Sequence, residues 1–214
     1  MPLRYLILEK SPSLRMIQQK KLQAFQNIEW HEEITMAGLE GVILANEFFD
    51  ALPVERFVRH DTGNVQTDVD YQNETFVETG EGERCEKCLL YPEVLSPILK
   101  AFVKGGALII DYGAEQLDHS TLTAYQNHEI VSVFKDPGLC DLTAHVHFTD
   151  LAQVFIDCGW QIDFLKTQAH FLLEQGILPE TGLNAENYGL KRLLDPRLMG
   201  ERFKVMKAEP RLED

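Results

Sequence analysis

Residues 41–53 read GVILANEFFDALP and carry the clearest indication of the fold class. Its first five residues contain no polar side chain, which is typical of a parallel strand that is covered on both faces in the middle of a sheet. The residues that follow are polar and aromatic, with Asn46, Glu47 and Asp50 among them. In an open α/β sheet, ligands bind at the carboxyl ends of the strands. We therefore expect a binding site directly after residue 45.

Other apolar runs and helical patterns continue the alternation outward from this strand. Buried strands are expected at 3–9 and 107–110, with shorter ones at 28–34, 161–166 and 203–206. Helices are expected from Pro12 to about 26, at 92–104, after Gly113 up to about 127, and at 149–158, 168–176 and 184–194. Between about 54 and 90, short alternating pieces separated by turn residues predict an antiparallel excursion. The pattern predicts an α/β fold with an open, mostly parallel sheet and helices on both faces.

Composition limits the classes of partner and the compartment. Acidic residues outnumber basic ones by 34 to 20, a net charge of -14, which argues against nucleic acid and anionic membranes as partners. The acidity favours a cationic substrate, or serves only to keep the protein soluble. There is no run of 18 apolar residues and no signal-peptide pattern, so we expect a cytoplasmic protein. Cys85 and Cys88 lack a second cysteine pair, so we expect thiols in an exposed loop and no metal.

Polar residues at the strand ends are the first candidates for ligand binding and catalysis. Glu9 closes the opening strand, where a carboxylate can accept two hydrogen bonds from the hydroxyls of a ribose, although an exposed glutamate is also common there. Glu47 and Asp50 would be costly to bury unless they are paired, so they indicate a positively charged ligand. The alternative is a strand-to-helix turn that Asp50 caps, with the phenylalanines in the core.

The loop 138–148 carries a second group of polar side chains at alternating positions. In an extended segment, alternation puts Asp141, Thr143, His145 and His147 on one side. No further histidine or carboxylate at helical spacing accompanies them, so we interpret this face as a rim that contacts the substrate rather than as a metal site.

These residues resemble a known family. The segments that match it in order are Glu9-Lys10-Ser11-Pro12, NEFFDALP at 46–53, Asp111-Tyr112-Gly113, DLTAHV at 141–146, Thr167-Gln168, and MGERF at 199–203. They are similar to the MidA family of methyltransferase-like proteins that use S-adenosylmethionine (SAM). The mitochondrial members methylate an arginine on a complex I subunit and assist assembly of that complex.

The resemblance implies a Rossmann-like class I SAM methyltransferase sheet with a β-rich insertion. Residues 1–53 would form part of the SAM-binding half, 54–90 the insertion, and 91–214 the C-terminal half with the substrate-side loop. The expected cofactor-binding residues are Glu9, Ser11, Asn46 and Glu47, and the expected catalytic residues are Asn46, Glu47 and Asp50. The expected substrate-binding residues are Asp111, Tyr112, Asp141, Thr143, His145 and Gln168. The implied partner is a protein substrate, such as a basic segment or a respiratory-complex subunit.

Two departures from the family accompany the resemblance. The family usually has aspartate at the position of His147, which puts a titratable ring where a fixed charge is expected. The family's first strand and glycine-rich SAM loop would precede Leu3. We therefore expect a fragment, or one half of a split protein whose upstream half is a separate chain. Without that central strand, the backbone edges of 3–9 and 41–45 would lie open.

Two other functions compete with methyl transfer. A non-catalytic binding or assembly module would keep the fold but bind no cofactor, because it lacks the glycine-rich loop. A nicotinamide dehydrogenase would share the acidic residue after an early strand, but nothing resembles the catalytic pair of such an enzyme. Titration with SAM distinguishes the methyltransferase from the non-catalytic module.

Overall fold

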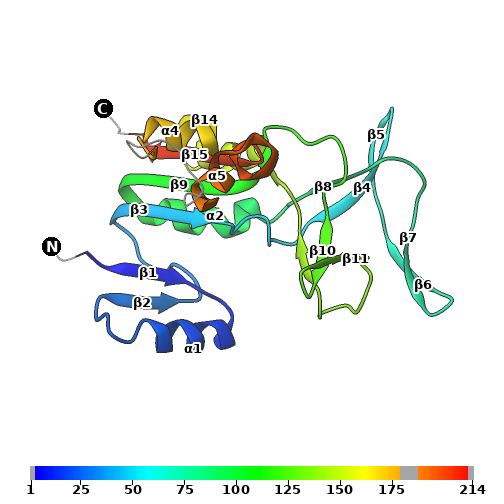
Figure 1. Cartoon of the computed structure of the whole chain (residues 1–214), viewed down its shortest axis with the longest axis horizontal. Helices are drawn as coiled ribbons and strands as arrows, with labels where there is room; N and C mark the ends of the chain where they lie inside the picture. The colour runs from blue at the N-terminus through cyan, green and yellow to red at the C-terminus, as the bar shows by residue number, and fades with distance from the viewer. Residues whose placement is uncertain (1–2, 179–187, 212–214) are drawn as a thin grey trace.

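The computed structural model describes residues 3–178 and 188–211 and shows an α/β fold (Figure 1). Its main sheet consists of β3 (Leu39–Asn46), β9 (Phe102–Ala114), β13 (Val146–His147), β14 (Trp160–Thr167) and β15 (Phe203–Pro210). The strands β3 and β13 pair with β9 in parallel, whereas β15 is antiparallel to both β9 and β14. Because β14 is antiparallel to β15, it runs in the same direction as β9, so only β15 opposes the other strands of the main sheet. The expected mostly parallel sheet is therefore confirmed here, with β15 as its antiparallel strand.

The long strand β9 is the centre of this sheet. Gly105 and Gly106 were expected to end the preceding helix, but both lie inside β9, because the helix α2 (Tyr91–Ala101) ends earlier. Gly105 pairs with Gly41 of β3, and a Cβ on Gly105 would lie 1.7 Å from the carbonyl oxygen of Gly41. A side chain cannot fit there, so the glycine allows the two strands to approach. Gly113 was expected between the strand at 107–110 and a helix, but it also lies within β9.

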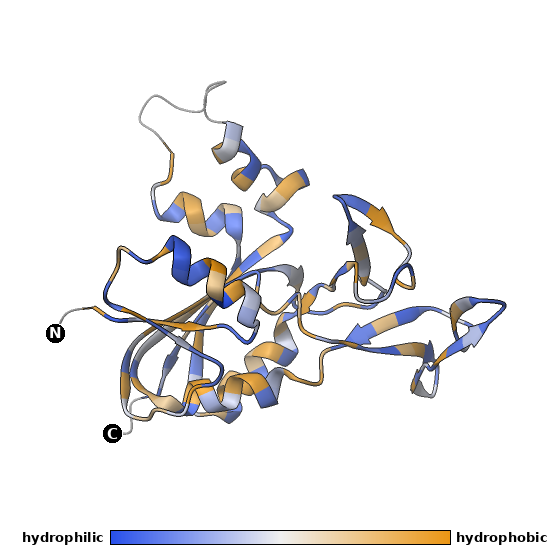
Figure 2. Cartoon of the chain, turned by 90° about the horizontal axis from the view of Figure 1, so that it is seen from below, coloured by the Kyte–Doolittle hydropathy of each residue, from blue (hydrophilic) through white to orange (hydrophobic). Residues whose placement is uncertain are grey.

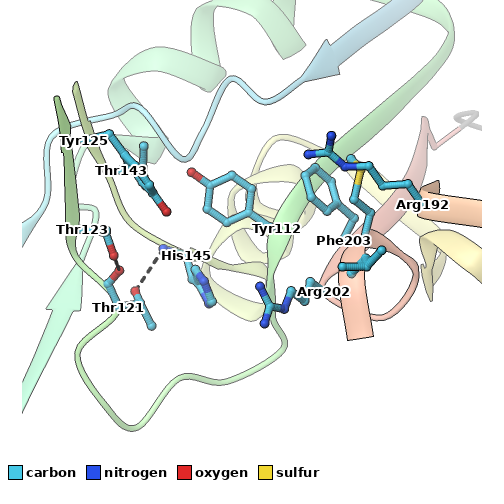
Figure 3. A pocket seen from close by; sticks show the side chains of 11 residues that line it. Tyr112, Thr121, Thr123, Tyr125, Thr143, His145, Arg192, Arg202 and Phe203 are labelled. Atoms are coloured by element: carbon cyan, nitrogen blue, oxygen red, sulfur yellow. Dashed lines mark hydrogen bonds between the residues drawn. The ribbon is translucent and has the colours of Figure 1, made fainter. Parts of the chain in front are cut away.

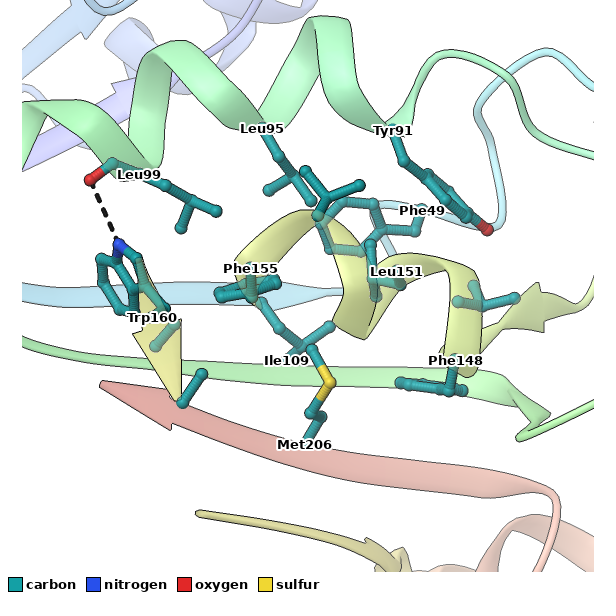
Figure 4. Close-up of a cluster of buried hydrophobic side chains, with 14 residues drawn as sticks. Phe49, Tyr91, Leu95, Leu99, Ile109, Phe148, Leu151, Phe155, Trp160 and Met206 are labelled. Atoms are coloured by element: carbon teal, nitrogen blue, oxygen red, sulfur yellow. Dashed lines mark hydrogen bonds between the residues drawn. The ribbon is translucent and has the colours of Figure 1, made fainter. Parts of the chain in front are cut away.

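The hydrophobic core lies between the main sheet and the helices α2 and α3 (Phe148–Asp157), as Figure 4 shows. Leu95 and Leu99 of α2 pack with Phe155 of α3 against the sheet residues Ile109 and Met206. Trp160 closes one end of the cluster, and its indole N–H donates to the carbonyl oxygen of Leu99 at 3.3 Å. Both helices present apolar residues at helical spacing, so their burial follows directly from the sequence pattern.

The N-terminal unit consists of β1 (Tyr5–Leu8), α1 (Pro12–Lys21) and β2 (Ile28–His31). Ser11 caps α1 as expected, because its hydroxyl accepts the N–H of Leu14. The two strands form a parallel pair of their own, apart from the main sheet (Figure 1).

The facing edges of β1 and β3 are open within the described residues, because β1 pairs with β2 and β3 pairs with β9. Val42 is 72% exposed and Leu44 is 69% exposed. The open edge of 41–45 agrees with the expectation, since β3 pairs only with β9 among the described residues. The expected cover on both faces is wrong there, because these two side chains are exposed. The same holds for the expected burial of 3–9, where Leu3 and Tyr5 are exposed.

The predicted antiparallel excursion is confirmed. It contains β4 (Glu55–His60), β5 (Gly63–Gln66), β6 (Val69–Gln72), β7 (Thr75–Glu78) and β8 (Arg84–Lys87). Figure 2 shows these strands as an arm that extends away from the main sheet. Arg56 forms ion pairs with Glu78 and Glu86 at 3.2 Å and 3.5 Å inside the arm. The expected exposed loop for the cysteines is wrong, because Cys85 is buried in β8 and Cys88 packs against the core.

The helix expected after Gly113 up to about residue 127 is absent from the structure, and a small antiparallel sheet occupies the region instead. It contains β10 (Thr123–Gln126), β11 (Glu129–Val131) and β12 (Asp141–Thr143). Asn127 and His128 connect β10 to β11 with φ angles of 52° and 66°. A two-residue turn with positive φ at both positions matches the twist of a β-hairpin, and asparagine tolerates this conformation well.

The C-terminal segment adds α4 (Gln168–Glu174), α5 (Tyr188–Leu194) and the short helical turn η2 (Pro196–Gly200) before β15. Of the helix expected at 184–194, residues 184–187 lie outside the described residues. Within residues 3–178 and 188–211, no helix combines the length and the hydropathy that crossing a bilayer requires.

Candidate functional site

Asp111 near the end of β9 organises the residues that follow β3. One carboxylate oxygen accepts the backbone N–H groups of Phe48, Phe49 and Asp50 at 3.2, 2.9 and 3.3 Å. The other oxygen accepts the N–H of Tyr112 at 2.9 Å. Because Asp111 is fully buried and its oxygens are occupied in this way, it positions the turn at 47–50. Because Asp111 lies in the core, its position does not support the expected direct contact with substrate.

Burial, with a further contribution from the Asp50 carboxylate, raises the pKa of Asp111 to about 7. The four backbone N–H groups oppose this shift but do not cancel it, because the side chain has no access to water.

Asp50 lies on the turn with an incomplete set of hydrogen bonds. It is 7% exposed, and its Oδ2 accepts a short hydrogen bond from the hydroxyl of Tyr112. Its Oδ1 is buried and has no hydrogen-bond partner among the described residues. A buried carboxylate oxygen without a donor is costly, so this atom is suited to an N–H group or a cation from outside the chain.

Asn46 and Glu47 lie at the carboxyl end of β3 and are both exposed. The side-chain amide of Asn46 donates to Glu47 at 3.4 Å, and the backbone N–H of Glu47 donates to the carbonyl of Ile110 at 2.9 Å. Glu47 adopts a φ of 48°, a left-handed conformation that is uncommon for a residue with a side chain. Strain of this kind is held by the surrounding structure and concentrates at functional sites.

Glu9 follows β1 and is partly buried against α1. Its two carboxylate oxygens accept the N–H of Ser11 and the side-chain amide of Gln18, both at 2.9 Å. A carboxylate has about four acceptor sites, so two remain for an external donor pair such as a sugar diol. The side chain is thus oriented by the helix cap and retains the capacity that was expected of it.

A cavity of about 360 Å³ opens beside Tyr112, and it brings together three of the expected substrate-side residues (Figure 3). Tyr112, Thr143 and His145 line it. The ring of His145 packs edge-on against Tyr112 with 5.4 Å between centroids. Burial lowers the pKa of His145, and nearby His119 and Arg202 lower it further. Burial and the hydrogen bond to Asp50 raise the pKa of the Tyr112 hydroxyl, so it stays protonated as a donor.

Two expected substrate residues lie elsewhere. Asp141 is exposed at the start of β12 and does not line the cavity. Gln168 is buried, and its side-chain amide donates to the carbonyl oxygen of Leu193 at 3.1 Å, which ties α4 to α5. His147 caps α3 by accepting the N–H of Asp150 at 3.3 Å. In the described ranges 3–178 and 188–211, no cluster of three or more histidine, cysteine or acidic side chains could hold a metal.

The arm does not line the cavity but supports its wall through Glu86, which the sequence did not indicate. The carboxylate of Glu86 in β8 accepts the hydroxyl of Ser120 at 2.6 Å and the N–H of Thr121 at 2.8 Å. Thr121 in turn accepts the N–H of His145 at 3.0 Å. Arg192 and Arg202 also line the cavity and were not predicted. The MGERF segment contains Arg202, but only the tertiary structure brings it to Tyr112.

Comparison with solved structures shows the same fold in longer proteins. The chain superposes on a crystal structure from Burkholderia thailandensis with a TM-score of 0.83 and 25% identity, covering 97% of this chain and 66% of that one. A second structure from that organism, described as bound to S-adenosyl-homocysteine, gives a TM-score of 0.81 at 24% identity, covering 97% of this chain and 64% of that one.

Curated relatives carry a more specific name. "Protein arginine methyltransferase NDUFAF7, mitochondrial" from Danio rerio is 30% identical over 76% of this chain and 46% of its own length. The human protein of the same name is 30% identical over 78% of this chain and 45% of its own length. The chain thus spans a little under half the length of these relatives. The expected cytoplasmic location is wrong by this comparison, because the relatives are named as mitochondrial proteins.

A protein family described as "Putative S-adenosyl-L-methionine-dependent methyltransferase" matches residues 1–79 and 63–165. These matches cover more than half of the chain and include β1, β3, the turn at 47–50 and the first part of the cavity wall. The chain belongs to this family of SAM-dependent methyltransferases.

Proposed function

We propose that this chain forms part of a methyltransferase that transfers a methyl group from SAM to an arginine of a protein. The buried Oδ1 of Asp50, which has no hydrogen-bond partner among the described residues, is the observation that carries the choice of acceptor. A guanidinium offers five N–H donors in a planar fork and a positive charge, which such an acceptor needs. The curated relatives named as protein arginine methyltransferases support the same acceptor.

The proposal includes a finer division of the fold. Residues 1–53 form part of a Rossmann-like SAM-binding half, 54–90 an insertion, and 91–214 the substrate-side half. Glu9 and Asn46-Glu47 follow β1 and β3, which point in the same direction in Figure 1. Carboxyl ends of parallel strands are where such sheets bind ligands.

The donor set fits a cofactor with a sugar diol and a positive charge. Glu9, with Ser11 beside it, would hold the ribose through the acceptor sites that its helix cap leaves free. Asn46 and Glu47 would lie beside the sulfonium, since an exposed amide and a carboxylate favour a cation. SAM supplies a methyl group that its sulfonium has already activated.

The task of the chain is then to orient the acceptor and to take up a proton. Asp50 would hold the guanidinium through Oδ1, while the hydroxyl of Tyr112 keeps Oδ2 in place. Asp111 would fix the turn that carries Asp50, through the backbone N–H groups of 48–50. Alignment of the nucleophile at near-attack distance accounts for much of the rate in such reactions. The proton that leaves the arginine would pass to Asp50 or Glu47.

The alternative is a binding or assembly module that keeps this fold and does not bind the cofactor. The open edges of β1 and β3 favour it, since part of the sheet is uncovered in the described residues. Calorimetric titration of the whole chain with SAM separates the two functions.

The methyltransferase proposal predicts micromolar SAM binding that weakens about ten-fold in Glu9→Ala, on the scale of a hydrogen bond to a charged group. Glu33→Ala is the matched control, because Glu33 is an exposed glutamate after β2. Circular dichroism of both variants checks that loss of the bond to Ser11 has not unfolded α1. No heat of binding up to millimolar SAM would reject the cofactor site and favour the module.

A further inference from the structure

The cavity beside Tyr112 has a charge opposite to that of the molecule. The chain carries a net charge of -14, yet the residues that line this cavity include two arginines and no carboxylate. Arg192 comes from α5 and Arg202 from the turn before β15. Within the described residues, neither guanidinium forms an ion pair or a side-chain hydrogen bond, whereas Arg197 between them is paired with Asp195 at 2.8 Å.

The cavity also has a rigid aromatic side between the two charges. The ring of Tyr112 packs against His145 on one side and Phe203 on the other, each with 5.4 Å between centroids. Figure 3 shows Arg192 and Arg202 on opposite sides of the row formed by Tyr112 and Phe203. Both guanidiniums line the same cavity, and the planar fork of each matches the geometry of an oxyanion.

Hydroxyl groups complete the lining opposite the arginines. Thr121, Thr123 and Thr143 line the wall that β10, β12 and the preceding loop form. A hydroxyl donates to an anion as readily as it accepts from a backbone group. The hydrogen bonds that Ser120 and Thr121 donate to the Glu86 carboxylate hold the loop in place, so this wall exists before a ligand binds.

We propose that this cavity is an oxyanion site, and that it binds a carboxylate side chain of the protein substrate close to the arginine that is methylated. The claim that the bound oxyanion is a carboxylate of the protein substrate rests on the proposed function. Tyr112 then separates two sites of opposite charge, because its hydroxyl bonds to Asp50 while its ring lines the cavity with the arginines. The substrate class is a segment in which an acidic residue accompanies the target arginine. Free phosphate offers the same chemistry and is the competing source of the oxyanion.

Two short peptides test the site on the whole chain. Both contain one arginine, and they differ only in a glutamate or a glutamine two residues away. We expect the glutamate peptide to bind at least about ten-fold more tightly than the glutamine peptide in fluorescence anisotropy, as a charge-assisted pair would give. Arg202→Gln and Arg192→Gln should each remove this difference. Arg202→Lys should retain part of it, because a lysine keeps the charge but loses the fork.

Arg197→Gln is the matched control, since Arg197 is 87% exposed, lies in the same segment and does not line the cavity. It should leave the difference between the peptides intact. Thermal melting of each variant shows whether the fold is retained. Competition by inorganic phosphate that depends on Arg202, with equal binding of the two peptides, would keep the oxyanion site but overturn the substrate carboxylate as its source.

Equal peptide binding without phosphate competition would overturn the oxyanion site itself. This failure is distinct from failure of the proposed function. If only the oxyanion site fails, methyl transfer proceeds equally on both peptides. If the proposed function fails, no methyl transfer occurs although the difference in peptide binding persists.

Discussion

Replacing Asp111 with asparagine tests whether a buried carboxylate controls both the stability of this chain and the turn at its candidate site. Asparagine keeps the shape of the side chain and removes the titration. The pKa of Asp111 is raised from 3.8 to about 7, mainly because the group is buried. The folded protein therefore binds this proton more tightly than the unfolded chain does. The contribution to stability is fully present at low pH and is lost as the pH rises from about 4 to about 7.

The size of the effect follows from the two pKa values. Between the unfolded and folded pKa values, each pH unit costs about 1.4 kcal/mol of stability. The total loss of stability from about pH 4 to about pH 7 is therefore roughly 4 kcal/mol. The sequence pI is about 4.9, so measurements should start at pH 5.5 to keep the protein in solution. Between pH 5.5 and pH 8, the stability of the wild type relative to Asp111→Asn should fall by about 2 kcal/mol.

Urea unfolding followed by tryptophan fluorescence provides the measurement, because Trp160 is buried in the core. Asp195→Asn is a control that should leave the pH dependence between pH 5.5 and pH 8 unchanged, since the hydrogen bonds from Arg197 lower the pKa of Asp195 to about 2. Its contribution is present at neutral pH and is lost only as the pH falls toward 2. A difference between wild type and Asp111→Asn that stays constant from pH 5.5 to pH 8 would refute the reasoning. Carboxyl chemical shifts of Asp111 against pH would then show whether the group is ionised throughout.

Two further predictions concern the core and the open edge of the sheet. Leu151→Ala in α3 should lower the free energy of unfolding by about 2–5 kcal/mol, because Leu151 is fully buried between α3 and the sheet; a loss below about 1 kcal/mol in urea unfolding would contradict this packing. Leu44→Lys on β3 should reduce self-association in sedimentation velocity, because an exposed apolar edge strand invites pairing and a lysine blocks it. Val65→Lys on the arm is the control, since it changes a comparably exposed residue away from this edge, and an equal effect of both variants would show that general charge is responsible.

Local pattern determined most of the elements near the site. The apolar runs at 41–45 and 107–110 became strands of the main sheet, and Ser11-Pro12 began a helix as its capping chemistry requires. The alternation between 54 and 90 became antiparallel strands. Asn46, Glu47 and Asp50 could be named as candidates from the sequence, because ligands bind at the carboxyl ends of strands in an α/β sheet, and they lie at the carboxyl end of β3 and on the turn that follows it. The helix expected up to about residue 127 was wrong. A turn at Asn127-His128 joins β10 and β11 there, and these strands pair only with each other and with β12.

Most strands and helices could be predicted from the sequence, since caps, apolar periodicity and turn residues act within a few positions of one another. The folded structure was needed to show that β15 runs antiparallel beside β9 and that Asp111 is buried under the turn at 48–50. It also decided that Arg202 and Thr121 share a cavity with Tyr112. Pairing, burial and charge at these places depend on residues tens of positions apart, which no local pattern encodes.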